Sequence, residues 1–307
     1  MRYALDPAMP VLLRPDGAVQ VGWDPRRAVL VRPPTGLTPG GLAAVLRALA
    51  APMECDRVRR LAAVHGLTDT DGFSALLDEL VTAGALRAEA GEGRPTGRAL
   101  SIRVHGDGPL SELLADGLRC SGARVGRTAH GHGAGAAIDV DLVVLADTLA
   151  ADPRLVRDLH GAGVPHLPVL VRDGTGVVGP LVIPGLTSCL TCADLHRTER
   201  DPAWPALAAQ LREVVGTADR ATLLATAALA LGQLQRIIAA VRGLPGDSPA
   251  PATLNATVEV DVATGGIRAR RWVRHPLCGC WPGVSRVGRT NTGARLRATT
   301  PLRATTT

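Results

Sequence analysis

Alternating apolar and polar positions divide the chain into a short first region and a longer second region. In the first region, three β-rich runs separated by turn residues predict three strands within residues 10–33. Three segments with helical spacing follow at about 38–50, 56–64 and 71–83. Three strands followed by three helices predict a small, self-contained unit over residues 1–90.

The second region alternates strands and helices, which predicts an α/β fold with a parallel sheet and helices on both of its faces. A linker rich in Gly, Pro and Arg precedes it at 91–98. The expected elements, in order, are a strand at 100–104, a helix at 109–120, strands at 123–125 and 138–146, a helix at 152–161 and a strand at 167–171. The run at 138–146 is the clearest signal of a strand that is buried on both faces.

Two helices and a hairpin are expected to complete this region. The helices are expected at about 203–214 and 217–242, and the hairpin strands at 256–262 and 267–272, around Gly265-Gly266. We expect the second domain to span residues 99–284. Arg, Thr and Gly dominate residues 285–307 without apolar periodicity, which predicts a disordered basic tail.

Charge argues against a nucleic-acid partner. The net charge of +6 arises at the end of the chain, because nine arginines and no acidic residue follow Asp261. A winged-helix DNA-binding regulator is an alternative for the first region, since its helices carry Arg57, Arg59 and Arg60. However, residues 1–98 are nearly neutral, with 12 arginines against 11 acidic residues, and their strands precede their helices, which argues against that function.

A membrane span and secretion are not expected. The longest apolar run, residues 221–232, is too short to cross a bilayer, and Gln233, Gln235 and Arg236 end it. The first residues, Met-Arg-Tyr-Ala-Leu-Asp-Pro, lack the basic and apolar segments of a signal peptide. We therefore predict a cytoplasmic protein.

Two tight cysteine pairs carry the clearest chemistry. Cys189 and Cys192 form the first pair and Cys278 and Cys280 the second, with 85 residues between the pairs. Four thiolates that converge from two distant segments suit one structural zinc ion in tetrahedral coordination. His275, three residues before the second pair, is an alternative fourth ligand.

Other interpretations of the cysteines stay open at this point. A disulfide is unusual in a cytosolic chain, and a redox Cys-x-x-Cys motif would leave the second pair unexplained. Inert buried thiols are the third possibility. Cys55 and Cys120 are isolated within apolar helical patterns, so we expect them in the core.

A glycine loop follows the first strand of the second region. Gly106 and Gly108 lie between a strand and a helix, where such a loop can cradle a phosphate. Ser111 replaces the expected third glycine, and no acidic residue follows about 20 positions on, at 125–128. We interpret the loop as a tight turn that no longer binds nucleotide, with a working nucleotide site as the alternative.

Together these features resemble the ThiF/MoeB-type adenylyltransferase fold, which ubiquitin-activating enzymes share. The resemblance rests on the glycine loop, a strand that ends at Asp147, the segment 179–185 before the first cysteine pair, and the second pair. It covers residues 98–283, and the cysteines are its most specific part.

A narrower branch looks more similar. Residues 192–205 and 275–280 resemble the ThiF-like component of azole-forming cyclodehydratases, the leader-peptide-binding proteins of thiazole/oxazole-modified microcin (TOMM) pathways. In that branch, a PqqD-like, winged-helix-like recognition element precedes the ThiF-like domain. The strand and helix order of residues 1–90 fits that element.

The resemblance implies a binding role in the biosynthesis of a ribosomal peptide. Active ThiF-type enzymes use a lysine and an arginine around the ATP phosphates, whereas all 34 basic residues here are arginines. We therefore expect no ATP on this chain, no catalytic residues, and Asp147 as either a strand-end residue or a remnant of the nucleotide site. ATP would be used by a YcaO-type partner for azoline formation. Whether the chain counts as an enzyme, and whether it forms a homodimer, stay open.

The expected peptide site is the third strand of the first region. The leader would add as a strand beside Ala28, Val29, Leu30, Val31 and Arg32, with pockets toward the helix at 71–83. An ordinary paired strand without a free edge is the alternative. The alternative function is an active ThiF-type adenylyltransferase that activates a C-terminal carboxylate with ATP.

Overall fold

The computed structural model describes residues 1–89, 99–129, 140–242 and 250–280. The chain divides into two compact units, Met1–Thr96 and Gly97–Thr307, which we describe separately. The expected linker at 91–98 and the expected disordered tail at 285–307 lie outside the described residues.

The first unit contains the three strands and three helices that the sequence predicts, together with three further short strands. Its elements are β1 (Arg2–Leu5), β2 (Val11–Leu13), β3 (Val19–Val21), β4 (Val29–Val31), α1 (Pro39–Ala48), β5 (Met53–Glu54), α2 (Cys55–Val64), α3 (Thr70–Thr82) and β6 (Leu86–Glu89). They form two antiparallel sheets, with the strand orders β2-β3-β4 and β5-β1-β6.

Local signals set the helix starts of this unit. Thr38 caps α1 by accepting a hydrogen bond from the backbone N–H of Gly41 at 3.0 Å, and Pro39 occupies the first helical position. Asp69 caps α3 in the same way, through Gly72. Phe73, the only phenylalanine of the chain, is fully buried in α3 among leucines of α1 and α3. The unit therefore has a hydrophobic core of its own.

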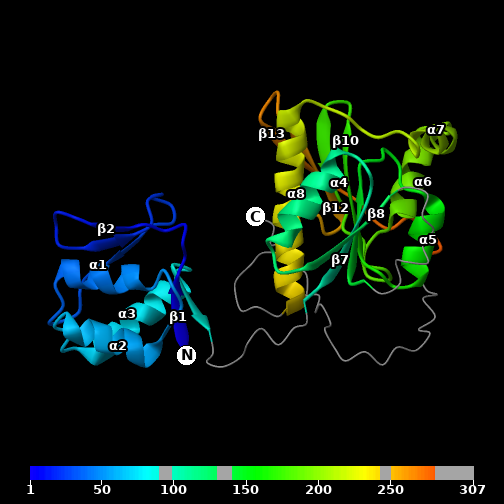
Figure 1. Ribbon diagram of the computed structural model, residues 1–307. Coiled ribbons are helices and arrows are strands. Elements are labelled where there is room, and N and C mark those ends of the chain that lie inside the picture. The colour runs from blue at the N-terminus through cyan, green and yellow to red at the C-terminus, as the bar shows by residue number, and fades with distance from the viewer. Residues whose placement is uncertain (90–98, 130–139, 243–249, 281–307) are drawn as a thin grey trace, which may run out of the picture. The chain divides into compact units, whose positions relative to one another are not determined.

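The second unit is a mixed α/β domain (Figure 1). Its elements are β7 (Ser101–His105), α4 (Pro109–Arg119), β8 (Arg124–Thr128), β9 (Leu142–Ala146), α5 (Pro153–Gly161), β10 (His166–Arg172), β11 (Thr175–Val178), α6 (Leu190–Arg200), α7 (Trp204–Leu211), α8 (Arg220–Arg242), β12 (Ala256–Asp261) and β13 (Gly266–Arg271). One seven-stranded sheet runs in the order β13-β12-β11-β10-β9-β7-β8.

The sheet is only partly parallel. The four neighbouring strands β10, β9, β7 and β8 are parallel to one another, as expected. Strands β11, β12 and β13 are antiparallel to their neighbours. The sequence prediction missed β11, which follows β10 through a tight turn at Asp173-Gly174, where both residues have positive φ. The hairpin of β12 and β13 joins the sheet at this antiparallel side.

Helices cover both faces of the sheet (Figure 1). In β9 the side chains of Leu142, Val144 and Ala146 pack in the core beneath α4 and α8, whereas Val143 and Leu145 pack beside α5 on the other face. All five residues are buried. The α/β class and the doubly buried central strand are therefore confirmed.

Helix α8 corrects one expectation. By length and composition alone, Arg220–Val241 is long and apolar enough to cross a membrane, so the apolar stretch does not end at Gln233. Gln233 is itself buried, and α8 adds six apolar side chains to the core against the sheet: Leu223, Ala227, Ala230, Leu234, Ile237 and Ile238. A core helix of a domain passes the same test of length and composition.

Candidate functional site

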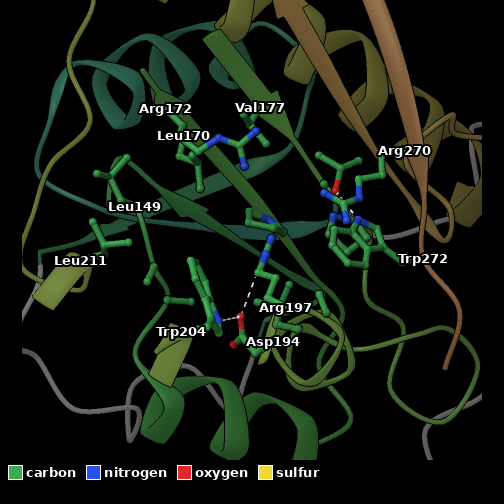
Figure 2. A pocket seen from close by; sticks show the side chains of 18 of the residues that line it. Leu149, Leu170, Arg172, Val177, Asp194, Arg197, Trp204, Leu211, Arg270 and Trp272 are labelled. Carbon is green, nitrogen blue, oxygen red and sulfur yellow. Dashed lines mark hydrogen bonds and ion pairs between the residues drawn. The ribbon is translucent and has the colours of Figure 1, made fainter. Parts of the chain in front are cut away.

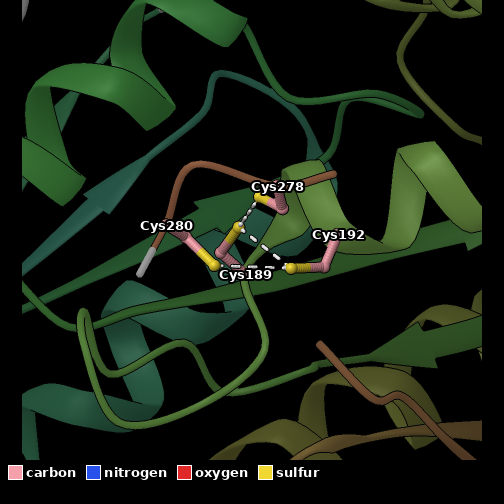
Figure 3. Close-up of side chains that lie close together, drawn as sticks. All are labelled: Cys189, Cys192, Cys278 and Cys280. Atoms are coloured by element: carbon pink, nitrogen blue, oxygen red, sulfur yellow. Dashed lines mark hydrogen bonds between the residues drawn. The ribbon is translucent and has the colours of Figure 1, made fainter. Parts of the chain in front are cut away.

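The four paired cysteines converge in the second unit (Figure 3). Cys189 is the N-cap of α6 and Cys192 lies in the first turn of that helix, whereas Cys278 and Cys280 follow β13. The sulfur atom of Cys189 lies 3.5 Å from that of Cys278 and 3.7 Å from that of Cys192. Cys192 and Cys280 are also 3.5 Å apart, sulfur to sulfur. All four sulfurs lie within 4.8 Å of one another.

These separations suit a shared metal ion. Four sulfurs at about 2.3 Å from one ion, in tetrahedral coordination, would be roughly 3.8 Å from one another. A disulfide needs a sulfur–sulfur distance of about 2.05 Å, and all six cysteines are free thiols. The cluster is also closed, because Cys189 and Cys192 are buried and the other two are half-buried. The four cysteines could therefore hold a metal ion of structural type.

Without a metal, burial keeps most of these thiols protonated. Burial raises the pKa of Cys189 to about 12, and it raises the pKa values of Cys278 and Cys280 to about 11. For Cys192, burial also opposes ionisation, but hydrogen bonds from the backbone of His275 and Cys189 outweigh it and lower the pKa. A metal ion has to displace these protons, and its charge is what would make four adjacent thiolates stable.

His275 supports the cysteine loop from outside the sulfur cluster. Its Nδ1 accepts a hydrogen bond from the backbone N–H of Leu277 at 3.1 Å, so Nε2 carries the proton and donates to Glu199 in α6 at 2.8 Å. Glu199 also lies 3.5 Å from Nδ1 of His196, on the same helix. The His196, Glu199 and His275 group thus joins α6 to the second cysteine pair. Sequence analysis singled out His275 only as an alternative metal ligand; the i, i+3 spacing of His196 and Glu199 was the missed signal.

The isolated cysteines are less buried than expected. Cys55 is half-buried at the start of α2 and packs against the core of the first unit. The expectation of a core position is wrong for Cys120, which is exposed. Cys120 is the C-cap of α4, so it lies beyond the last residue of the helix's buried face.

The glycine loop is filled by a side chain of the protein. Asp147, at the end of β9, is fully buried and reaches the start of α4. Its carboxylate accepts hydrogen bonds from the backbone N–H groups of Gly108 at 2.8 Å and Leu110 at 2.9 Å, with longer contacts from Ser111 at 3.3 and 3.4 Å. A helix N-terminus has unpaired N–H groups and a partial positive charge, so a carboxylate stabilises it as a phosphate would.

Gly106 and Gly108 give the carboxylate its space. A Cβ atom on Gly108 would lie 2.7 Å from the carboxylate carbon of Asp147, and one on Gly106 would lie 2.6 Å from Oδ2 and 2.9 Å from the carbonyl oxygen of Ala146. Gly106 also has a φ of +159°. The Gly-x-Gly pattern is thus required by the packing of Asp147, with or without a nucleotide.

The predicted peptide-binding residues lie in the first unit. Ala28 and Val29 are half-buried, Val31 is buried, and Leu30 and Arg32 are exposed. Within the described residues, β4 pairs only with β3, so its other side is an edge of the sheet.

Comparison with solved structures identifies proteins of the same fold. No protein-family model and no curated protein matches the sequence. Among solved structures, "Heterocyclase in complex with substrate and Cofactor" superposes with a TM-score of 0.62 at 16% identity, over 91% of this chain and 40% of that one. The heterocyclase TruD gives a TM-score of 0.62 at 17% identity, over 91% of this chain and 42% of that one. Escherichia coli MccB with ATP gives 0.56 at 12% identity, over 91% of this chain and 99% of that one.

The chain has the ThiF-type fold. The resemblance inferred from the glycine loop and the cysteine pairs is confirmed at this level, since heterocyclases and MccB share the architecture. The identities are too low to transfer an activity. The chain spans about two-fifths of the length of the heterocyclases it matches, but nearly the whole length of MccB.

Metal binding is testable through Cys192. We expect purified protein to contain about one metal ion per chain, and Cys192→Ser to lose it, because the remaining three sulfurs leave the ion open to water. The variant should melt about 10 °C lower or more, since structural metal binding contributes to folding. Elemental mass spectrometry and calorimetry measure both. Cys120→Ser, at an exposed thiol, is the matched control, and equal metal content in both variants would refute the site.

The carboxylate of Asp147 gives a second test. Asp147 has a φ of +75°, which asparagine tolerates, so Asp147→Asn changes the charge and acceptors with little backbone strain. We expect a loss of about 1–3 kcal/mol in the free energy of unfolding, because N–H groups of α4 lose their anionic acceptor. Urea denaturation measures it. Asp158→Asn, on the exposed side of α5, should change stability by less than about 0.5 kcal/mol. Equal stability of the two variants would contradict the capping role.

Proposed function

We propose that this chain binds the leader segment of a ribosomal precursor peptide and presents it to a YcaO-type, ATP-dependent partner for azoline formation. The observation that carries the proposal is the outer edge of β4, which pairs with no other described strand, in a chain with the fold of heterocyclases. Those heterocyclases are more than twice as long as this chain. In the proposed pathway, the YcaO-type partner uses the ATP. This chain supplies proximity, since it holds the substrate where another protein reacts with it.

Hydrogen-bond geometry identifies which backbone groups of β4 face the edge. Arg14 N–H donates to the carbonyl oxygen of Ala18, and Gly22 N–H donates to that of Pro10, so the even-numbered residues of β3 face β2. Alternation then turns Val19 and Val21 toward β4. Their partners in the register are Val31 and Val29. The backbone groups of residues 28, 30 and 32 therefore point to the open side.

The two edges of this sheet differ. On β2, the outward carbonyl oxygen of Val11 already accepts a hydrogen bond from Arg47 of α1 at 2.8 Å. On β4, Ala28 N–H donates to Asp24, but no hydrogen bond from Leu30 to another described residue uses the open side. The Leu30 side chain is 55% exposed, and Trp23 nearby in the sequence is 77% exposed. An added strand would gain backbone hydrogen bonds from the edge and apolar contact from these side chains.

Hydrogen bonds join the loop after β4 to the start of α3. The carbonyl oxygen of Thr35 accepts hydrogen bonds from the backbone N–H groups of Thr68 at 3.1 Å and Asp69 at 3.3 Å. Asp69 is the N-cap of α3, so the loop that follows β4 is tied to the start of that helix. This connection supports α3 as the wall that would select side chains of the bound leader.

In this proposal the ion at the four cysteines is zinc. Four thiolates in a closed tetrahedral cluster are typical of structural zinc and leave no position for a catalytic water. Zinc would anchor the β12–β13 hairpin to α6. In the proposed role, the protein works in the cytoplasm, and its partners are the precursor peptide and the YcaO-type protein. Neither a membrane nor a nucleic acid is a partner in this role.

The second candidate is an active adenylyltransferase, because MccB with ATP matches over 99% of its length. Two features of this chain weigh against it. No lysine is available for the phosphates. The N–H groups at the start of α4 already bind the carboxylate of Asp147. We therefore favour the binding role.

Leu30→Pro tests strand addition. Proline removes the N–H that faces the open side of β4 and leaves the bonds to β3 in place, so folding should be retained while leader binding weakens by about ten-fold or more. The probe is a fluorescently labelled leader peptide, encoded by a short reading frame beside this gene and measured by polarisation. Leu13→Pro removes the outward N–H of β2 and is the matched control. Equal leader binding by the Leu30→Pro and Leu13→Pro variants would exclude β4 as the binding site.

The neighbouring genes test the proposed pathway. The absence of both a YcaO-type gene and a short reading frame nearby would contradict it.

ATP–pyrophosphate exchange separates the two functions. We expect this chain alone to give only background exchange, with or without the precursor peptide, because its phosphate loop is filled and lacks a lysine. Radiolabelled pyrophosphate incorporated into ATP is the readout. Exchange well above background would establish the adenylyltransferase instead.

A further inference from the structure

A cavity of about 520 Å³ lies on the face of the sheet that also carries α5 and α6. Strands β10 to β13 contribute to its lining, as do α6, α7 and the segment between β9 and α5. Gly106, Gly108 and Asp147 are not among the lining residues, and neither is any cysteine. The cavity is therefore separate from the glycine loop and from the sulfur cluster. Its volume is in the usual range for a small ligand or a short peptide segment.

One wall is a stack of indole and guanidinium groups (Figure 2). Arg197 of α6 stands between two tryptophans, with its guanidinium carbon 5.0 Å from the ring centroid of Trp204 and 5.1 Å from that of Trp272. Arg270 lies on Trp272 at 4.4 Å. Cation–π contact fixes the planes of these guanidinium groups, so their N–H donors are already ordered before a ligand binds.

Hydrogen bonds hold the two indoles in turn. Trp204 Nε1 donates to Asp194 at 3.0 Å, and Trp272 Nε1 donates to Thr257 at 2.8 Å. Asp194 also accepts a hydrogen bond from Arg197 at 2.8 Å. The wall is thus a built surface whose aromatic faces and charges are fixed by the fold. Apolar side chains of Leu149, Leu170 and Val177 complete the lining toward β10 and β11.

The charges of the cavity are unevenly paired. Four arginines and four acidic residues line it. Arg197 pairs with Asp194, and Arg172 pairs with Glu259 at 2.9 Å. The other two acidic residues, Asp173 and Asp201, are exposed, the first in the β10–β11 turn. Among the described residues, neither Arg200 nor Arg270 has a carboxylate partner.

The surroundings of Arg270 are cationic. Burial lowers the pKa of its guanidinium, the nearby charges of Arg200 and Arg197 lower it further, and the carboxylate of Glu259 opposes them only in part. Arg200 Nε donates to the carbonyl oxygen of His196 at 3.2 Å, which leaves its terminal N–H groups. An anion between Arg200 and Arg270 would relieve the repulsion and accept charge-assisted hydrogen bonds from both guanidinium groups, a geometry that suits a planar carboxylate or a phosphate.

We propose that this cavity binds a ligand in which a carboxylate or phosphate is joined to a flat or apolar group. The oxyanion would lie against Arg270 and Arg200, and the flat group against the indole of Trp272 or the apolar side chains near β10. Such a group occurs in free small molecules and in peptide segments that combine an acidic and an aromatic residue. The site does not depend on strand addition at β4, so either proposal can fail alone.

The test uses the full chain and three anionic probes: hippurate, phenyl phosphate and the capped peptide acetyl-Gly-Phe-Asp-Gly-amide. Hippuramide, which lacks the charge, is the matched neutral compound. We expect saturable binding of at least one anionic probe by calorimetry, with shifts of indole N–H resonances in NMR spectra, and much weaker binding of hippuramide. Binding should weaken as salt is raised.

Variants locate the site. Arg270→Gln and Arg200→Gln should each weaken binding by roughly ten-fold, and Arg270→Lys, which keeps the charge, should weaken it less. Arg124→Gln, on β8 at the opposite edge of the sheet, is the matched control and should bind as the unaltered chain does. Preference for hippurate or phenyl phosphate would support a small-molecule ligand, and preference for the capped peptide would support a peptide segment. Equal affinity for hippurate and hippuramide, no binding of any probe up to millimolar concentration, or unchanged binding by both glutamine variants would overturn the proposal.

Discussion

The convergence of four thiols is the constraint that joins the segment after β13 to the first turn of α6. β12 and β13 form the outer edge of the sheet, and β13 has no strand neighbour beyond it among the described residues. Its sequence, Gly266–Arg271, is mostly exposed, so burial of apolar side chains contributes little to its position. The chain then turns back to place Cys278 and Cys280 beside the first turn of α6. A metal ion bound to the four cysteines would stabilise the position of this hairpin where few apolar side chains are buried, as metal ions do in small elements that cannot bury enough apolar surface.

The convergence of the four cysteines also affects which side chains line the cavity. Arg270 lies near the end of β13 and Trp272 directly follows that strand, whereas Arg197 lies in α6, which is distant from β13 in the sequence. The cysteines and the His275–Glu199 hydrogen bond hold these elements together. The stack of indole and guanidinium groups can form only where both are fixed, so the sulfur cluster orders a recognition surface although it does not touch a ligand itself.

Sequence could predict the elements with strong local signals. The capped helices α1 and α3, the buried strand β9 and the hairpin at Gly265 all follow from caps, periodicity and turn residues. The short strands β1 and β5 were missed because each depends on a partner about 50 residues away, which no local pattern reveals. The cysteine pairs were found because their spacing is itself the signal. Asp147 was found, but its role was not, since only the fold shows that its carboxylate reaches the start of α4. The cavity could not be predicted, because its arginines and tryptophans come from elements that only the sheet brings together.

The open side of β4 has a cost for the protein while it is unoccupied. Unpaired backbone groups beside an exposed leucine form a template that a second copy of the same strand can extend, and such edges are where folded proteins begin to aggregate. Arg32 and Pro33 at the end of this strand oppose such growth, since a charge and a proline both disfavour further pairing. A sequence change that protects this edge more strongly would therefore also close it to any incoming strand.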